Sequence, residues 1–294
     1  MTIKNPNPQS EVRLSSTKTL EFANGEKLDL TKAQVMGVLN VTPDSFSDGG
    51  RFNSKSRAVK KALKMIKQGA AIIDVGGEST RPGAKEVSAE EEILRVAPVI
   101  KAIKSKSEVL ISLDSSKPEV MQAGLEAGAD MLNDVRSFTM PGALELAAKA
   151  KVPVCIMHMQ GAPATMQDKP EYLNVVSEVY EFLISRAQQL VKAGISKNKI
   201  IIDPGFGFGK TLEHNLDLLR DLDKFKHARM PLLAGISRKS MIGAILDIEK
   251  PEQRLYGSLS AAVIAVMHGA KIIRTHDVKP TVQAVKIANA VLAQ

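Results

Sequence analysis

The sequence has one cysteine, no tryptophan and few aromatic residues, and these shortages exclude several kinds of function. Aromatic side chains make up 4% of the 294 residues. A lone cysteine cannot form an internal disulfide, and Cys155 lies within the apolar run 153–157. A small side chain in such a run predicts a buried apolar role rather than a reactive thiol. Redox chemistry is therefore not expected.

The chain is basic, but it lacks the pattern of a nucleic-acid-binding protein. Its formal net charge is +8. Lysine and arginine are scattered along predicted helix faces, and without tryptophan and with few other aromatics there is little to stack against bases. We expect a solvated basic surface and no nucleic-acid partner.

Long apolar runs are also missing. The longest are too short and too often interrupted to cross a bilayer, and residues 1–16 lack the apolar core of a signal peptide. These features predict a cytoplasmic protein without a membrane partner. At 294 residues and 44% hydrophobic, the chain can form one large core. We expect a flexible tail over residues 1–14 and a single domain over residues 15–294.

Strand and helix patterns alternate along the chain from residue 34 onward. An Asn-Gly turn within residues 20–30 predicts a preceding β-hairpin, which could plug one end of a barrel. Eight short apolar runs predict strands near 35–40, 71–75, 109–114, 130–134, 153–158, 200–203, 231–235 and 271–274. Such alternation implies parallel pairing, so an α/β fold with a single (β/α)8 TIM barrel is the economical prediction. An open doubly wound sheet is the alternative.

The helices carry their own signals. Ser88 and Glu91 match a capping box, and Gly69 is placed to end an earlier helix. Apolar spacing predicts a long helix over 172–194, and small residues give 258–265 a face suited to close packing.

Polar side chains follow or end most of the predicted strands. They are Asn40, Asp74, Asp114, Asn133, His158, Asp203, Lys239, Arg274 and His276. Because the working residues of such barrels project from the carboxyl ends of the strands, these side chains should meet in one cup. Carboxylates in a low-dielectric cup need cationic or hydrogen-bonding ligands, and Arg81, Lys239 and Arg274 could hold an anion.

Several apparent motifs do not hold. The stretch 205–211 resembles the end of a phosphate-binding P-loop, but Pro204 stands where the first glycine is required. No second histidine has zinc-site spacing to His158, so a hydrogen-bonding role is favoured for it. The loops at 41–54 and 76–88 are long and polar, which is typical of segments that cover a substrate. The helix start at 237–240 favours a carboxylate or phosphate.

The chain also resembles a known family in six motifs that occur in family order. They lie at 39–50, 74–84, 157–161, 203–210, 235–243 and 272–278, and they are similar to those of the bacterial dihydropteroate synthases. That family joins 6-hydroxymethyl-7,8-dihydropterin pyrophosphate to 4-aminobenzoate with magnesium, releasing pyrophosphate. The resemblance therefore implies a pterin-binding barrel that is commonly a homodimer and is inhibited by sulfonamides.

The resemblance also implies roles for individual residues. The expected catalytic residues are Asp74, Asp114, Asp203, Lys239 and Arg274. Pterin pyrophosphate would contact Thr80, Arg81, Asp114, Asn133, Met157, Asp203, Lys239, Arg274, Thr275 and His276, with Arg274 stacked on the ring. Phe46, Pro82, Phe208, Ser237 and Arg238 would form the aminobenzoate pocket, and Asn40 would help hold Mg2+.

One position departs from the family pattern, and two other functions remain open. Ser115 stands where the family more often has threonine, and it keeps the hydroxyl. A related pterin-binding methyltransferase acting on a corrinoid should lack the motifs at 79–83 and 237–240, which are both present. A non-catalytic small-molecule-binding barrel is the second alternative, and an aminobenzoate-dependent pyrophosphate assay separates it from the enzyme.

Overall fold

The computed structural model describes residues 18–42, 50–79, 86–161, 166 and 170–293. The predicted tail over 1–14 lies outside them. Eight parallel strands lie in the order β8-β7-β6-β5-β4-β3-β10-β9. Their bounds are β3 Gln34–Asn40, β4 Ile72–Gly76, β5 Leu110–Asp114, β6 Met131–Asp134, β7 Val154–Met157, β8 Ile200–Asp203, β9 Leu233–Ala234 and β10 Ile272–Thr275.

The two ends of this sheet meet and close it into a barrel. Ile202 of β8 forms a parallel bridge with Leu232, and its N–H donates to the Pro231 carbonyl at 3.0 Å. The predicted barrel is confirmed, and the open doubly wound sheet is wrong because its edge strands would not pair. The strand predicted over 231–235 shortens to two residues, and His158 lies one residue beyond β7.

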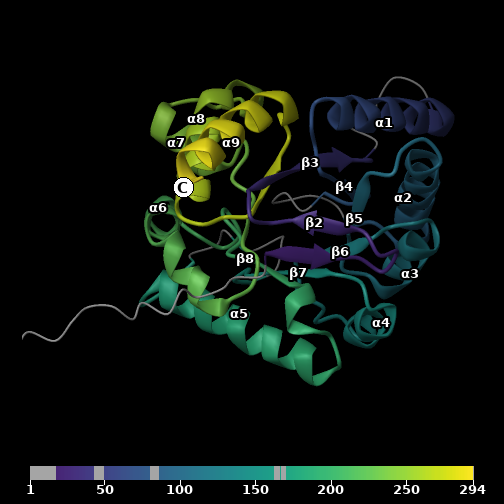
Figure 1. Cartoon of the computed structure of the whole chain (residues 1–294), viewed down its shortest axis with the longest axis horizontal. Helices are drawn as coiled ribbons and strands as arrows, with labels where there is room; N and C mark the ends of the chain where they lie inside the picture. Colours follow the sequence, from purple (N-terminus) through teal and green to yellow (C-terminus); the bar gives the residue numbers. More distant parts are fainter. Residues whose placement is uncertain (1–17, 43–49, 80–85, 162–165, 167–169, 294) are drawn as a thin grey trace, which may run out of the picture.

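Helices surround the strands in chain order, from α1 through α9 (Figure 1). Their bounds are α1 Gly50–Lys67, α2 Ala89–Lys104, α3 Pro118–Glu126, α4 Ala143–Ala150, α5 Val175–Lys192, α6 Leu212–Arg220, α7 Ser240–Leu246, α8 Leu255–Met267 and α9 Val278–Leu292. Short 3-10 turns lie at Lys197–Lys199, Leu222–Ala228 and Pro251–Gln253. Ser88 caps α2 by accepting the Glu91 N–H at 3.2 Å, which is the Ser88 half of the predicted capping box. The helix expected from residue 172 begins later, at Val175, because Asn174 caps it.

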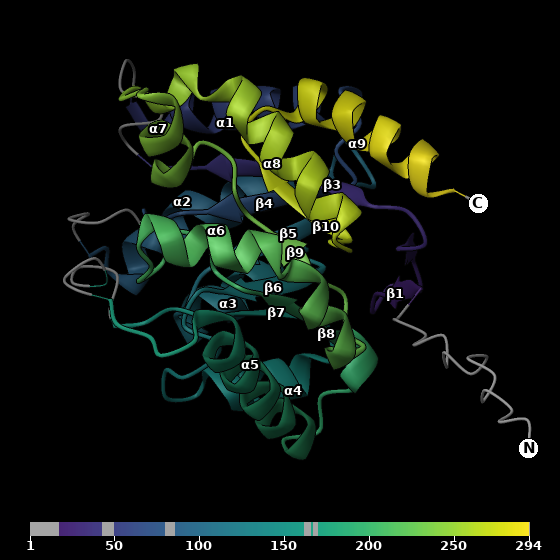
Figure 2. The same ribbon diagram turned by 90° about the vertical axis from the view of Figure 1, so that its left-hand side faces the viewer.

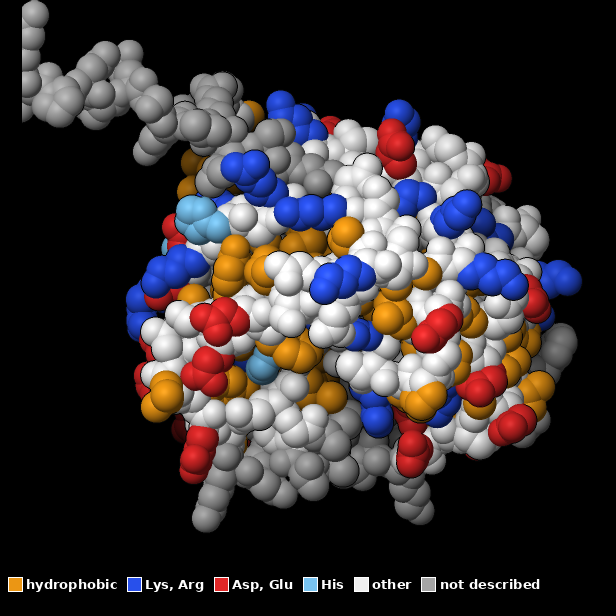
Figure 3. Space-filling view, turned by 90° about the horizontal axis from the view of Figure 1, so that it is seen from below, with side chains coloured by type: hydrophobic (Ala, Val, Ile, Leu, Met, Phe, Trp, Pro, Cys, Tyr) orange, Lys and Arg blue, Asp and Glu red, His pale blue; other side chains and the backbone are white. Residues whose placement is uncertain are grey.

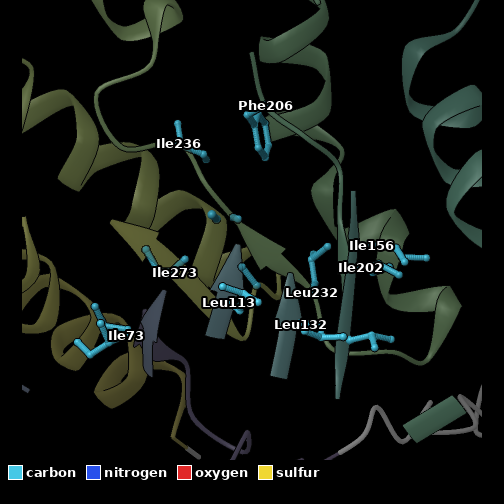
Figure 4. Close-up of a cluster of buried hydrophobic side chains, with 14 of the residues drawn as sticks. Ile73, Leu113, Leu132, Ile156, Ile202, Phe206, Leu232, Ile236 and Ile273 are labelled. Atoms are coloured by element: carbon cyan, nitrogen blue, oxygen red, sulfur yellow. The ribbon is translucent and has the colours of Figure 1, made fainter. Parts of the chain in front are cut away.

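Alternation along the strands divides the core into two parts. One set of side chains faces outward and packs against the helices, including Ile73, Leu113, Leu132, Ile156 and Ile202 (Figure 4). The other set fills the lower barrel interior, namely Met36, Ile72, Leu110, Met131, Cys155, Ile201, Leu233 and Ile272. Cys155 is fully buried in this second layer, so the predicted apolar environment is confirmed.

The N-terminal hairpin closes the lower end of the barrel. Strands β1 Thr19–Glu21 and β2 Lys27–Asp29 pair antiparallel. Leu20 and Leu28 in these strands, and Phe22 and Leu30 directly after them, are buried and pack on the inner layer. Figure 2 shows β1 on the opposite side of the barrel from α7. Burying these side chains removes the amino-terminal end of the barrel from solvent and leaves its carboxyl-terminal end for a site.

The surface charge is dispersed on the face drawn in Figure 3. Among the side chains described there, lysine and arginine alternate with acidic and apolar residues. No helix within the described parts of the chain is both long and apolar enough to cross a membrane.

Candidate active site

The inner face of the barrel changes from apolar to polar toward the carboxyl ends of the strands. On each strand, the residue two positions after the one in the lower interior layer also points into the barrel. These residues are Val38, Asp74, Ser112, Asn133, Met157, Asp203, Gly235 and Arg274. Asn40, Asp114 and His276 follow one step higher on their own strands. The strand period therefore gathers most of the predicted pterin contacts on one inner surface.

Arg274 joins two carboxylates at the centre of this cup. Its Nε lies 2.6 Å from Asp74 Oδ2, and one terminal nitrogen lies 2.6 Å from Asp114 Oδ2. Asn133 Nδ2 donates to Asp74 Oδ2 at 3.3 Å from the adjacent side. Four of the predicted residues are thus in one hydrogen-bonded group.

The charges of this group do not balance, because two carboxylates share one guanidinium. Burial raises the pKa of Asp114 to about 7, and the negative charge of Asp74 adds to this against the opposing effect of Arg274. Burial alone would lower the pKa of Arg274, but the two carboxylates outweigh it and raise that pKa. Arg274 therefore stays charged, and Asp114 is ready to pair with a further hydrogen-bond donor.

Asp203 forms the opposite side of the cup. Its Oδ1 accepts the Gly205 N–H at 2.8 Å. Burial raises the pKa of Asp203, although that hydrogen bond and the charges of Lys239 and Arg274 oppose the rise. The Lys239 ammonium also lies 4.0 Å from the centre of the Phe208 ring, a cation–π distance. A predicted pterin residue and a predicted aminobenzoate residue are therefore in contact.

Two pairs of side chains join the segments that follow β9 and β10. Ser237 Oγ lies 3.2 Å from His276 Nδ1, and Arg238 binds Asp277 through Nε and a terminal nitrogen at 2.9 and 2.6 Å. Arg238 has a left-handed backbone with φ of 61°. Burial, followed by the charges of Arg274 and Arg238, lowers the pKa of His276 to about 3. The imidazole is therefore neutral at pH 7.

A family model described as pterin binding enzyme matches residues 36–276. The chain is 57% identical to the dihydropteroate synthase of Escherichia coli K12 over 272 residues, which are 92% of this chain and 96% of that relative. It is 52% identical to the dihydropteroate synthase of Haemophilus influenzae, covering 92% and 98% of the two chains. This chain belongs to the dihydropteroate synthase family.

Solved structures of dihydropteroate synthases have the same fold. The Yersinia pestis enzyme in complex with a sulfonamide drug has a TM-score of 0.89 and 51% identity, covering 94% of this chain and all of that chain. The Xanthomonas albilineans enzyme with 4-aminobenzoic acid has a TM-score of 0.89 and 45% identity. The same enzyme with 7,8-dihydropteroate has a TM-score of 0.86 and 43% identity, and each comparison covers 94% and 99% of the two chains.

Four of the predicted site residues lie outside the described part of the chain, and one described residue turns its side chain away from the cup. Phe46, Thr80, Arg81 and Pro82 lie outside the described residues. Thr275 is described, but its hydroxyl is turned away from the cup and lies 3.0 Å from Thr281 Oγ1. It also accepts the Asp277 N–H at 3.1 Å. Since alternation places Arg274 inward and Thr275 outward, only the Thr275 backbone could contact a ligand.

The structure also describes Arg238 and the helix start at 237–240, which were both expected at the aminobenzoate pocket. Two nitrogens of the Arg238 guanidinium bind Asp277, so this side chain is held against the segment that follows β10. The helix expected there is α7, which has only seven residues and begins at Ser240. A helix this short has a weak dipole.

The sequence reading missed several buried polar residues that support the cup. Lys210 is 3% exposed and lies beneath the loop after β8. Lys117 Nζ lies 2.7 Å from both Glu78 and the deeply buried Glu92. The fully buried Asp134 accepts the Arg136 N–H at 2.8 Å and the Phe138 N–H at 2.5 Å. Lys210 directly follows the last glycine of the glycine-rich motif, and this position was the feature of the sequence that could have marked it as a functional residue.

Proposed function

We propose that this cup binds 6-hydroxymethyl-7,8-dihydropterin pyrophosphate and 4-aminobenzoate and joins them. The chain is a transferase of the pterinylmethyl group that produces 7,8-dihydropteroate and pyrophosphate in folate biosynthesis. The observation that carries the residue assignment is the set of inward acceptors and donors on three strands, namely Asp114, Asn133 and Asp203. The paired N–H groups of a pterin's guanidine-like edge match these carboxylates.

The pterin ring is proposed to lie against Met157, with Arg274 on its face. Met157 is buried next to Phe208 in a small apolar cluster, which supports an apolar contact below the ring. Arg274 is fixed at two points by Asp74 and Asp114, so the plane of its guanidinium is set before a ligand arrives. A guanidinium held in this way can stack on an aromatic ring without losing further side-chain entropy.

Aminobenzoate is proposed to bind between Phe208 and the segment containing Ser237 and Arg238. Phe208 supplies an aromatic wall, and Ser237 supplies a hydroxyl. Arg238 acts by holding this segment against Asp277 rather than by pairing with the carboxylate. Thr80, Arg81, Phe46 and Pro82 remain proposed ligand contacts on the strength of the motifs alone.

The reaction requires the departure of pyrophosphate and attack by the arylamine. Arg274 supplies positive charge near the departing pyrophosphate. Neutral His276 can donate a hydrogen bond to the pyrophosphate through Nε2, because its Nδ1 faces Ser237. Asp114 and Asp203 stabilise the positive charge that develops on the pterin methylene. An arylamine is already neutral at pH 7, so the site needs no strong general base.

Magnesium is proposed as the cofactor, and the residues at the rim fit it. Asn40 pairs in register with Gly76, which in turn pairs with Asp114, so an amide and a carboxylate lie on either side of a residue without a side chain. No group of three or more acidic, histidine or cysteine ligands exists within the described residues. Mg2+ is commonly held by one or two protein oxygens, water and substrate phosphates. Asn40 would help hold it, and the ion would neutralise charge on the leaving pyrophosphate.

The dimer and the inhibitor are also proposals. Tyr256, Ile264 and Met267 of α8 and Ile287 and Val291 of α9 are exposed apolar residues, and a second copy of the chain would bury them. Sedimentation analysis tests the dimer, because a monomer at micromolar concentration would exclude it.

Sulfonamides are proposed to occupy the aminobenzoate subsite. The cytoplasmic location predicted from the sequence also remains part of the proposal.

A pyrophosphate-release assay tests the proposed reaction. Release should require the enzyme, pterin pyrophosphate, Mg2+ and aminobenzoate together, and omission of aminobenzoate should abolish it. Pterin binding without release would instead indicate a non-catalytic binding protein.

A further inference from the structure

The Lys210 side chain ends inside the loop that follows β8 rather than in the cup. Its Nζ lies 2.9 Å from the Gly205 carbonyl and 2.9 Å from the Phe208 carbonyl. It also lies 3.3 Å from the His158 carbonyl and 3.0 Å from His158 Nδ1. Four acceptors from two neighbouring loops thus surround one buried amine.

Burial lowers the pKa of Lys210 to about 7 against the opposing charge of Asp203, but the number and kind of its acceptors favour the ammonium form. Three of them are backbone carbonyls, which can only accept, and an ammonium has three N–H donors whereas a neutral amine has two. His158 Nδ1 completes the group as an acceptor in a neutral ring. Burial, followed by the charge of Lys210, lowers the pKa of His158 to about 3, in keeping with that form.

The loop itself has few other restraints on its carbonyls. Gly205, Gly207 and Gly209 all have positive φ, so the backbone follows no regular ladder. Tyr172 donates its hydroxyl to the Gly209 carbonyl at 2.7 Å. Asn215 Oδ1 accepts the Gly207 N–H at 2.7 Å from the opposite side. The Phe208 N–H also donates to the Gly205 carbonyl at 3.1 Å. Among these contacts, Lys210 is the side chain that binds two carbonyls of the segment, those of Gly205 and Phe208.

The position of that segment sets the position of the Phe208 ring. The ring is 8% exposed and packs with Met157 and Met166. The Lys239 ammonium lies over it at 4.0 Å. A shift of the Phe208 carbonyl would move both the ring and the cation above it. By contrast, Asp203 belongs to strand β8, and its carbonyl is held by the His158 N–H at 3.1 Å.

We propose that Lys210 is a positioning residue for aminobenzoate, because its buried ammonium gathers the loop carbonyls and thereby places the Phe208 wall. It touches neither substrate. The inference rests on the proposed function, since it assigns a role toward one of the two substrates of that reaction.

The variant Lys210→Met tests it, because Met fills much of the space but donates no hydrogen bond. The expected result is a rise of about tenfold in the KM for aminobenzoate, equivalent to about 1.4 kcal/mol. The dissociation constant for 7,8-dihydropterin without pyrophosphate, measured by calorimetry, should change by less than about threefold, because Asp114, Asn133 and Asp203 remain on their strands. The matched control is Lys104→Met. Lys104 is also partly buried and ion-paired, but it binds Asp130, which directly precedes β6 at the opposite end of the barrel.

A purely structural role predicts a different outcome. If Lys210→Met and Lys104→Met lose similar stability and neither changes the aminobenzoate KM by more than about twofold, the positioning role is excluded. If Lys210→Met does not fold, the variant Tyr172→Phe tests the proposal instead, because it removes the hydrogen bond from Tyr172 to the Gly209 carbonyl in the same loop. Its aminobenzoate KM should rise by about two- to fivefold, and an unchanged value would overturn the proposal. A wild-type enzyme that forms no dihydropteroate would reject the proposed function instead.

Discussion

The Arg274 guanidinium lies 2.6 Å from Asp114 Oδ2 while its Nε holds Asp74, so one cation serves two carboxylates. This arrangement fixes Arg274 and leaves Asp114 without full charge compensation. We expect Asp114→Ala to lower turnover by about a hundredfold or more, because it removes a group that stabilises positive charge in the transition state. Steady-state kinetics measure the change. Lys60→Ala, on the exposed face of α1, is the control and should remain within about twofold of wild type.

The burial of Asp114 also predicts a pH dependence of stability. The pKa of Asp114 is about 7 in the folded protein and 3.8 in the unfolded chain. Between these values the folded state binds more protons, so the contribution of this residue to the free energy of unfolding falls as pH rises from about 4 to about 7. The variant Asp114→Asn cannot ionise at this position, so it does not lose this contribution to the free energy of unfolding as pH rises. Urea unfolding should show the variant gaining stability relative to wild type between about pH 4 and pH 7, by at most about 1.4 kcal/mol per pH unit. A relative loss over this range would mean that Arg274 instead holds the pKa of Asp114 low.

Gly205 approaches the neighbouring loop too closely for any side chain. A Cβ there would lie 2.0 Å from the His158 carbonyl oxygen, and φ is 70°. Gly205→Ala should therefore cost about 3 kcal/mol or more in the free energy of unfolding and weaken aminobenzoate binding. Gly194→Ala is the matched control, because φ there is 101° but no atom lies within 4 Å of the added Cβ. It should cost about 1–2 kcal/mol and leave the kinetics unchanged. Equal losses for the two variants would show that the contact with His158 is unimportant.

Lys117 neutralises a carboxylate that cannot reach solvent. The Glu92 side chain is 1% exposed, and its Oε1 has no hydrogen-bond partner among the described residues. Lys117→Met leaves this group unpaired and should cost about 3–5 kcal/mol in urea unfolding. Adding Glu92→Leu should recover most of that loss, since the buried charge is then removed. Lys224→Met breaks an exposed pair with Asp221 and should cost no more than about 1 kcal/mol. A single Lys117→Met variant as stable as wild type would contradict the pairing.

Arg238 and Asp277 should act as one unit on aminobenzoate binding. The two hydrogen bonds of the pair, at 2.9 and 2.6 Å, join the segments after β9 and β10. Arg238→Ala and Asp277→Ala should each raise the aminobenzoate KM by about tenfold, and the double variant should be no worse than either. The exposed pair Arg220 and Asp217 is the control, where neither alanine variant should change KM. Additive effects at Arg238 and Asp277 would indicate that each residue contacts the substrate separately.

The sequence predicted the barrel and much of the cup because both depend on local patterns. The apolar runs predicted the strands. A polar residue at the end of a run was predicted to lie in the cup. The same alternation turns the Thr275 hydroxyl outward, so a motif match alone was not enough at that position.

Residues that act at a distance in sequence could not be predicted in this way. Lys210 contacts His158 across 52 positions, and Lys117 contacts Glu78 across 39. Nothing in the local pattern of a lysine shows which carbonyls or carboxylates the fold will bring to it. The pairing of Arg238 with Asp277 was hidden for the same reason, and it supports the proposal that Arg238 holds its segment in place.

The most direct test of the account measures the bond that the cup is proposed to form. Purified enzyme is incubated with pterin pyrophosphate, Mg2+ and isotopically labelled 4-aminobenzoate, and the products are analysed by mass spectrometry with parallel measurement of pyrophosphate. The proposed reaction should form labelled 7,8-dihydropteroate and release one pyrophosphate for each labelled product. Pyrophosphate release without labelled product, or pterin binding with neither, would contradict it.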